Sequence, residues 1–202
     1  AAALSLRSVA RDLEMAPSAL YRYFDGRDAL LSALILDAYE SLAIEAEQAA
    51  ETARRTAGSD AERWLVVPAA MRAWALAHPH EWGLIFGAPV PGYRAPQQTV
   101  EPYARIAGSL IGPVVDAREA GRLHVGERSA VSPALAAAVI PVREALFPDM
   151  PVETVVRSVE AWTTIVGAIS LEVFGHWRNT VLDPGELFVA TARDVAASIG
   201  LR

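Results

Sequence analysis

Polar and aromatic side chains that could contact nucleic acid gather between Ser5 and Leu31. This stretch reads SLRSVARDLEMAPSALYRYFDGRDALL and contains two short helical patterns separated by a tight turn. Arg22 stands there between Tyr21 and Tyr23. A guanidinium can pair with a guanine edge or a phosphate, and a phenol hydroxyl suits a phosphate. These residue types in this pattern indicate a helix-turn-helix unit that reads DNA.

Two helices must position these side chains. Ser5 suits the N-cap of a helix over residues 5–13, whose apolar residues recur at helical spacing. Pro17 suits the first turn of a second helix over residues 17–24. In such a unit the second helix enters the major groove, so we expect its outer residues to face DNA. These outer residues are Ser18, Ala19, Tyr21, Arg22 and Tyr23, while Ser5 and Arg27 begin the flanking helices, where free N–H groups favour phosphate.

Composition narrows the class of protein. The chain has 202 residues, of which 52% are apolar, and it has no cysteine, which excludes disulfides and favours a reducing cytoplasm. It shows no signal-peptide pattern and no apolar run of about 18 residues, so we expect a cytoplasmic protein without membrane contact. The net charge of −6 argues against a general nucleic-acid coating protein. Residues 1–27 carry four arginines against three carboxylates, so this first segment is mildly basic.

The remainder of the chain predicts an all-α fold. Helical periodicity dominates, and no alternating pattern is flanked by hairpin turns. Ser59 is placed to cap a helix, and three prolines interrupt residues 87–96. Beyond the first two helices, the pattern predicts helices over residues 27–56, 60–77, 79–86, 98–121, 132–147, 152–177 and 184–199.

The order and spacing of L-S-L-R-S-V-A-R-x-L, followed by S-A-L-Y-R-Y-F-x-x-R-x-x-L-L, resemble the DNA-binding domain of the tetracycline-repressor (TetR) family. The resemblance implies a homodimer whose helical body binds a small-molecule effector, and a repressor that this effector releases from operator DNA. It also implies roles for eight residues. Ser5, Tyr21, Tyr23 and Arg27 would contact phosphates, and Arg7, Ser18, Ala19 and Arg22 would lie at or near bases.

A second group of residues resembles one branch of that family. His80-Glu81-Trp82-Gly83, Phe86-Gly87 and the later Phe174-Gly175-His176-Trp177 are similar to the branch whose body carries a Trp-His-Gly-type signature.

The chain departs from the family pattern at two places in the head. Glu14 stands where the family has a turn glycine, and a positive φ there would cost about 1 kcal/mol. The family's first helix would precede Leu4, where only three alanines stand. We therefore assign residues 1–46 to a DNA-binding head truncated at its N-terminus, and residues 47–202 to a helical ligand-binding and dimerisation body. The sequence leaves open whether this helix is absent from the protein or only from the residues given. A head that truly lacked it is expected to be loosened and to bind DNA poorly.

A heptad-like apolar pattern in the last two long helices predicts a dimer interface. The alternative is that both helices pack inside one monomer. The interface residues are Val155, Val159, Val166, Ile169 and Val173, together with Val189, Ala192, Ala196 and Ile199 of the final helix.

Aromatic side chains of the body predict a ligand pocket between helices, apolar with a few polar anchors. The alternative for each of them is ordinary core packing. The candidates are Trp74, Trp82, Phe86 and Trp162 for the apolar lining, with Arg72, Tyr103 and Thr163 as polar contacts.

The other chemistry-bearing residues form no recognisable catalytic or metal site. The four histidines lack metal-ligand spacing, and no phosphate-binding or nucleophile motif is present. We therefore predict no cofactor, no metal and no enzymatic activity. Two rival functions remain: a helical small-molecule-binding protein without DNA binding, and, less favoured, an all-α enzyme. The rival structural interpretation of residues 5–31 is a pair of ordinary amphipathic bundle helices.

Overall fold

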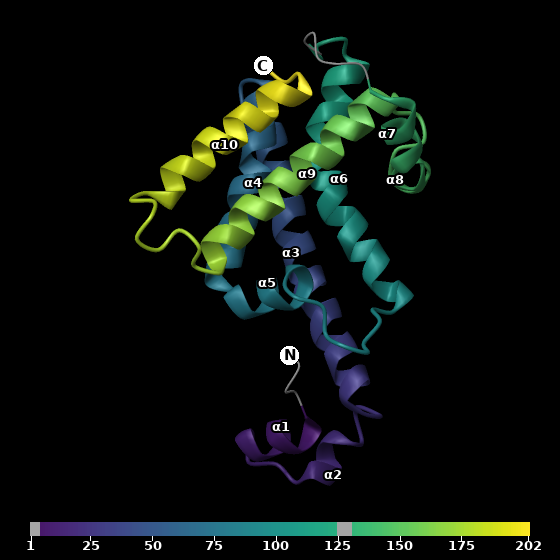
Figure 1. Cartoon of the computed structure of the whole chain (residues 1–202), viewed down its shortest axis with the longest axis vertical. Coiled ribbons are helices and arrows are strands. Elements are labelled where there is room, and N and C mark those ends of the chain that lie inside the picture. The colour runs from purple at the N-terminus through teal and green to yellow at the C-terminus, as the bar shows by residue number, and fades with distance from the viewer. Residues whose placement is uncertain (1–4, 125–130) are drawn as a thin grey trace.

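The computed structural model describes residues 5–124 and 131–202. These residues form helices joined by turns and loops, with no strand among them, so the all-α prediction is confirmed. Figure 1 shows the short helices of the head apart from the body, with the long helix α3 running between them. The segment preceding Leu4, where the family's first helix is expected, lies outside the described residues. None of the helices in the described ranges is long and apolar enough to cross a lipid bilayer.

The head contains helix α1 (Leu6–Asp12) and helix α2 (Pro17–Leu20). Ser5 caps α1 as predicted, because its Oγ accepts a hydrogen bond from the Ser8 N–H at 3.1 Å. Helix α2 is shorter than the predicted span of residues 17–24. The N–H groups of Tyr23 and Phe24 both donate to the Leu20 carbonyl at 3.0 Å, so the chain continues as tight turns.

Two separate apolar clusters hold the chain together. The head cluster buries Leu6, Ala10, Leu20 and Leu30. The body cluster begins at Ala38, farther along α3. Along α3, packing therefore changes from the head cluster to the body cluster between Leu30 and Ala38. The apolar face of α3 is continuous across this point, and only tertiary packing decides which partner covers each turn.

Three consecutive helices begin and end where the sequence predicts. They are α3 (Arg27–Thr56), α4 (Asp60–Ala77) and α5 (Pro79–Phe86). Ser59 and Glu62 form a capping box at the start of α4, with each side chain accepting from the other residue's backbone N–H. Strong local stop signals explain this agreement.

The predicted helix over residues 98–121 begins with a 3-10 turn, Gln97–Thr99, and continues as α6 (Val100–Glu119). The predicted helix over residues 132–147 is two helices, α7 (Pro133–Ala138) and α8 (Ile140–Leu146). The break falls at Val139, because Pro141 has no N–H to donate to the preceding turn.

The last two helices are α9 (Val152–Val173) and α10 (Pro184–Ile199). Helix α9 ends before the predicted residue 177. Gly175 has φ 76°, and the N–H of His176 donates back to the Leu171 carbonyl at 2.9 Å, which closes the helix with a left-handed cap. In the body α3 packs against α4 and α6, and α9 packs against α10, around the fully buried Trp64 and Trp82.

Candidate nucleic-acid interface and effector site

The predicted DNA-contacting side chains lie on one small part of the head. Ser18, Tyr21, Arg22 and Tyr23 are exposed, and Ala19 is half-buried. Tyr21 is 50% exposed and Tyr23 is 76% exposed, which is high for aromatic side chains. Leu20, which is buried, and Phe24, which packs on the head cluster, anchor the same segment from beneath. The outer face of this segment is thus a set of phenols and a guanidinium on a fixed support.

The flanking helix starts supply further groups. Arg7 is exposed in the first turn of α1. Arg27 is the first residue of α3, and its guanidinium lies 3.6 Å from the exposed carboxylate of Asp28. An exposed ion pair of this length contributes little, so a phosphate could take the place of Asp28. Helix N-termini favour anions through their free N–H groups, and Ser5 and Arg27 lie at the starts of α1 and α3.

The body contains a chain of aromatic contacts that brings four of the seven predicted ligand residues together. The rings of Trp82 and Phe86 are 4.4 Å apart, and those of Tyr103 and Trp162 are 5.2 Å apart. The ring of Phe86 lies 6.1 Å from that of Trp162, which joins the two pairs. The sequence interpretation missed Tyr39 of α3, whose ring lies 6.1 Å from Phe86 and 6.2 Å from Tyr103. Tyr39 directly follows Ala38, which lies on the apolar face of the long helix, and this position in the sequence is the signal that could have identified Tyr39.

The other three predicted ligand residues lie elsewhere, which corrects their assignment to one pocket. The Trp74 indole donates to Ser41 Oγ at 3.0 Å and stacks on His78. Arg72 donates to both carboxylate oxygens of Glu172, at 2.7 and 2.5 Å. Thr163 is exposed on the outer face of α9. These side chains already have structural partners or point away from the aromatic chain.

A cavity of about 200 Å³ adjoins the aromatic chain, between α6, α7, α8 and α9. Tyr103 and Trp162 line it, and burial raises the pKa of the Tyr103 phenol, which therefore stays neutral. The remaining lining is apolar except for Ser158, whose hydroxyl is buried and has no hydrogen-bond partner among the described residues. This cavity is the best candidate for an effector site.

Five of the nine predicted dimer contacts need correction. Val155, Ile169, Ala192, Ala196 and Ile199 are buried in the core of the single chain. Val166 and Val173 pack against that core, Val159 lines the cavity, and Val189 is exposed outside the groove between the helices. The heptad-like pattern marks the inward stripe of each helix, which is the alternative that the sequence left open. A stripe of this kind has the same spacing whether its partner lies in the same chain or in another.

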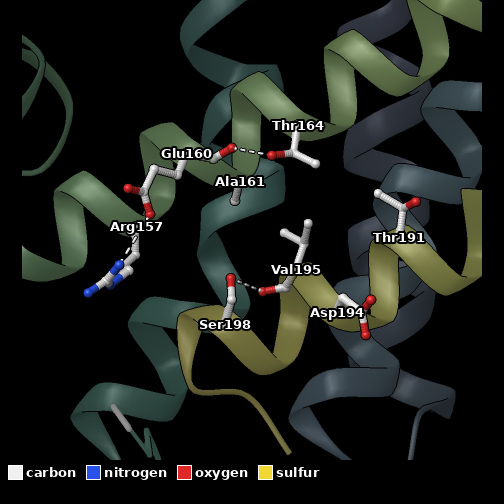
Figure 2. Close-up of a pocket in the computed structure, with 8 residues that line it drawn as sticks. All are labelled: Arg157, Glu160, Ala161, Thr164, Thr191, Asp194, Val195 and Ser198. Carbon is white, nitrogen blue, oxygen red and sulfur yellow. Dashed lines mark hydrogen bonds and ion pairs between the residues drawn. The ribbon is translucent and has the colours of Figure 1, made fainter. Parts of the chain in front are cut away.

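The outward faces of α9 and α10 form a long groove that the sequence did not single out. Figure 2 shows Arg157, Glu160, Ala161 and Thr164 on α9 opposite Thr191, Asp194, Val195 and Ser198 on α10. Farther along, the groove continues past Gly167 and Leu171 to Leu187. Arg157, Glu160 and Asp194 make one end of this groove charged, while small, hydroxyl-bearing and apolar residues line the rest. A second pair of helices could pack along it.

The two halves of the predicted family signature meet in space. A side-chain carbon at Gly83 would come within 3.6 Å of the Phe174 ring, and one at Gly87 would collide with the Gly83 carbonyl. Close packing therefore excludes a side chain at residue 87, whereas a side-chain carbon at residue 83 would make an ordinary contact with the Phe174 ring. The Trp82 indole donates to Ser170 Oγ at 3.1 Å, which ties the same segment to α9.

Comparisons with known proteins cover nearly the whole chain. Residues 1–34 match the family described as bacterial regulatory proteins, tetR family, and residues 64–195 match the family described as tetracyclin repressor-like, C-terminal domain. The HTH-type transcriptional regulator Rv1816 of Mycobacterium tuberculosis is 36% identical over 200 residues, which are 98% of this chain and 84% of that protein. The regulator Mb1846 of Mycobacterium bovis matches to the same extent.

Two solved structures have the same fold. One, described as a regulatory protein, SCO4313, is 36% identical with a TM-score of 0.75 and covers 98% of this chain and 87% of its own. The other, a Rhodococcus protein of unknown function, has a TM-score of 0.67 at 23% identity over 98% of this chain and 85% of its own. The family and the named relatives are transcriptional regulators, a class of proteins that are not enzymes. The chain belongs to the TetR family of helix-turn-helix transcriptional regulators.

Proposed function

We propose that this protein is a ligand-responsive repressor that binds operator DNA as a homodimer and leaves it when a small molecule occupies the body. The observation that carries the proposal is the exposed set of Tyr21, Arg22 and Tyr23 on a segment anchored by Leu20. Chromosomal DNA of a bacterium lies in the cytoplasm, so the proposed function also places the protein there. Within the family, the packing of Gly83 on Phe174 supports assignment to the Trp-His-Gly-type branch.

In the proposed complex, the segment after Pro17 enters the major groove. Arg22 pairs with base edges, and Arg7, Ser18 and Ala19 lie beside them. Tyr21, Tyr23, Arg27 and Ser5 bind the phosphates on either side and set the register of the helix.

The mechanism requires two copies of the chain and, within each copy, one helix that joins the head to the body. A palindromic operator presents half-sites about 34 Å apart, so two heads must be held at that spacing. The outward groove of α9 and α10 is the proposed dimer surface, with a two-fold axis through it. Helix α3 carries each head and packs in each body. An effector that binds better to a body conformation with the wrong head spacing shifts the population away from DNA.

The experiment is fluorescence anisotropy of a labelled duplex from the DNA upstream of the protein's own gene, measured over a range of salt concentrations. Arg22→Ala should weaken binding by about 1–3 kcal/mol and relax sequence preference. Arg27→Ala should lower the slope of log affinity against log salt by about one.

The matched control is Arg54→Ala on the same helix as Arg27, about 40 Å farther along it. This exposed arginine pairs locally with Glu51, and its removal should leave DNA affinity unchanged. Wild-type protein that never retains the duplex at any salt concentration would contradict the proposal and favour the small-molecule-binding alternative. Equal losses in Arg22→Ala and Arg54→Ala would contradict the assignment of the interface.

A further inference from the structure

The loop over residues 87–96, between α5 and the 3-10 turn, presents one tyrosine on a tight β-turn. Pro91 and Gly92 are the two central residues of this turn, and the Tyr93 N–H closes it by donating to the Val90 carbonyl at 3.1 Å. Proline fixes φ at the first central position, and Gly92 has φ 78°, the left-handed value that a type II turn needs at the second. The backbone that carries Tyr93 is therefore restricted in conformation.

The side chain of Tyr93 reaches α3. Its hydroxyl oxygen lies 2.9 Å from Ser32 Oγ. Ser32 Oγ also donates to the Asp28 carbonyl at 2.8 Å. A serine hydroxyl has a single proton, so with that proton on the Asp28 carbonyl, Tyr93 is the donor in the pair. Tyr93 and Ser32 are both half-buried, so water competes with this hydrogen bond less than it would at an exposed site.

Ser32 lies where α3 passes from the head to the body. Leu30 packs in the head cluster, and the body cluster begins at Ala38. Asp28, whose carbonyl accepts from Ser32, is in the first turn of α3. The hydrogen bond from Tyr93 therefore joins a loop of the body to the end of α3 that carries the head.

The loop that carries Tyr93 is anchored in the body on both sides. Phe86, the last residue of α5, directly precedes the loop and belongs to the aromatic chain. On the other side, Thr99 of the 3-10 turn is buried, and its hydroxyl donates to the Pro96 carbonyl at 2.9 Å. A segment that is fixed at both of its ends therefore holds α3 beside the head.

We propose that Tyr93 is a positioning residue for DNA binding, because its hydrogen bond to Ser32 sets the direction in which α3 carries the head. The inference rests on the function proposed above, since head direction matters when two heads must meet half-sites at a fixed spacing. Without the bond, α3 bends more freely between the two clusters, and only a fraction of the molecules hold both heads correctly. The apparent affinity for DNA falls in proportion to that fraction.

Tyr93→Phe tests this bond, because it removes the hydroxyl and keeps the ring. In the anisotropy assay the DNA affinity should fall about tenfold, since one hydrogen bond is lost in each of the two protomers. Ser32→Ala should cause a similar loss, and the double variant should be no weaker than either single variant, because both changes remove the same bond. Losses that add in the double variant would overturn the pairing.

Ser109→Ala is the matched control for Ser32→Ala. Ser109 Oγ likewise donates to a carbonyl four residues earlier, at 3.0 Å, but it lies on α6 in the body. Its removal should leave the DNA affinity unchanged. Equal losses in Ser32→Ala and Ser109→Ala would trace the effect to the loss of any such helix hydroxyl and would overturn the proposal.

The position of the head is measured without DNA by pulsed electron paramagnetic resonance. The chain has no cysteine, so spin labels attach only to introduced ones. Arg11→Cys on α1 and Arg118→Cys near the end of α6, both exposed positions, give one head-to-body distance in each chain. Labelled protein is diluted in unlabelled protein so that distances within one chain dominate. Tyr93→Phe should broaden this distance distribution, and Ser109→Ala should not.

The two measurements separate the possible failures, and thermal unfolding checks that each variant is folded. An unchanged distance distribution in Tyr93→Phe would overturn the proposal even if DNA affinity fell. A broadened distribution with unchanged DNA affinity would overturn the role of Tyr93 in DNA binding. Wild-type protein that never binds DNA would contradict the proposed function, whereas the distance measurement would still report whether Tyr93 positions the head.

Discussion

At the scale of single residues, Glu14 stores backbone strain in the helix-turn-helix. Its φ is 55°, in the left-handed region that a side chain disfavours, as its place at the family's turn glycine predicted. The Met15 N–H donates to the Ala10 carbonyl at 2.8 Å, so the turn is closed in spite of the strain. The head thus keeps the family's turn geometry with a residue that does not favour it.

Replacing Glu14 with glycine should therefore stabilise the head, by up to about 1 kcal/mol, because glycine adopts positive φ without steric cost. The measurement is the free energy of unfolding from urea denaturation. Glu45→Gly, an exposed position inside α3, is the control and should destabilise the protein by about 1 kcal/mol. A loss of stability in both variants would show that the turn does not need glycine.

At the scale of elements, one arginine fastens α6 to α3. Arg105 donates to Glu40 at 2.6 Å and to both carboxylate oxygens of Glu47 at 2.8 Å. The hydrogen bonds from Arg105 hold the pKa of Glu47 below its ordinary value. A carboxylate with a depressed folded-state pKa stabilises the protein above its unfolded pKa, and this contribution is lost as pH falls through the folded pKa.

The stability of Glu47→Gln should therefore depend on pH differently from that of the wild type. At pH 7 the variant should melt lower by a few degrees at most, since the pair is solvent-accessible and screened. Below about pH 4, where an ordinary glutamate is protonated, the difference should shrink toward zero. Melting curves between pH 3 and pH 7 measure it, with Glu45→Gln as the control on the same helix. A difference that grows as pH falls would contradict the sign of this contribution.

At the scale of the whole molecule, the proposed dimer surface lies on the outward faces of α9 and α10. The head lies away from the body, at the N-terminal end of α3 (Figure 1). Leu171 and Leu187 are exposed apolar residues that line this groove. If this surface pairs across a two-fold axis, both leucines of each protomer become buried in the interface.

Leu171→Glu should therefore raise the dissociation constant of the dimer by about tenfold or more, because it buries a carboxylate without a partner charge. Analytical ultracentrifugation measures the molecular mass in solution. The anisotropy assay should show that DNA affinity falls as the dimer dissociates. Val100→Glu is the control, since Val100 is an exposed apolar residue at the start of α6, away from the groove. Unchanged mass in Leu171→Glu would exclude this face as the interface.

Local signals determined most of the fold. The serine caps at Ser5 and Ser59 and the prolines at the starts of α2 and α5 act through neighbouring backbone groups. Local signals of this kind let the sequence place the boundaries of α3, α4 and α5 correctly. The exposed phenols and arginine after Pro17 follow from the same local pattern. Two of the errors in helix length, at Val139 and Phe174, lie beside a proline or a glycine whose local effect the helical periodicity does not show.

By itself, the sequence determined the all-α fold and the outer residues of the head, because short-range periodicity and capping encode them. The order and spacing of residues 4–31 carried the resemblance to the family. Only the tertiary structure decided which partner covers each apolar stripe. It assigned Val155 and Ile169 to the monomer's core and brought Tyr39 to Tyr103. The hydrophobic effect is non-directional, so an apolar stripe on a helix requires burial but does not specify which other element buries it.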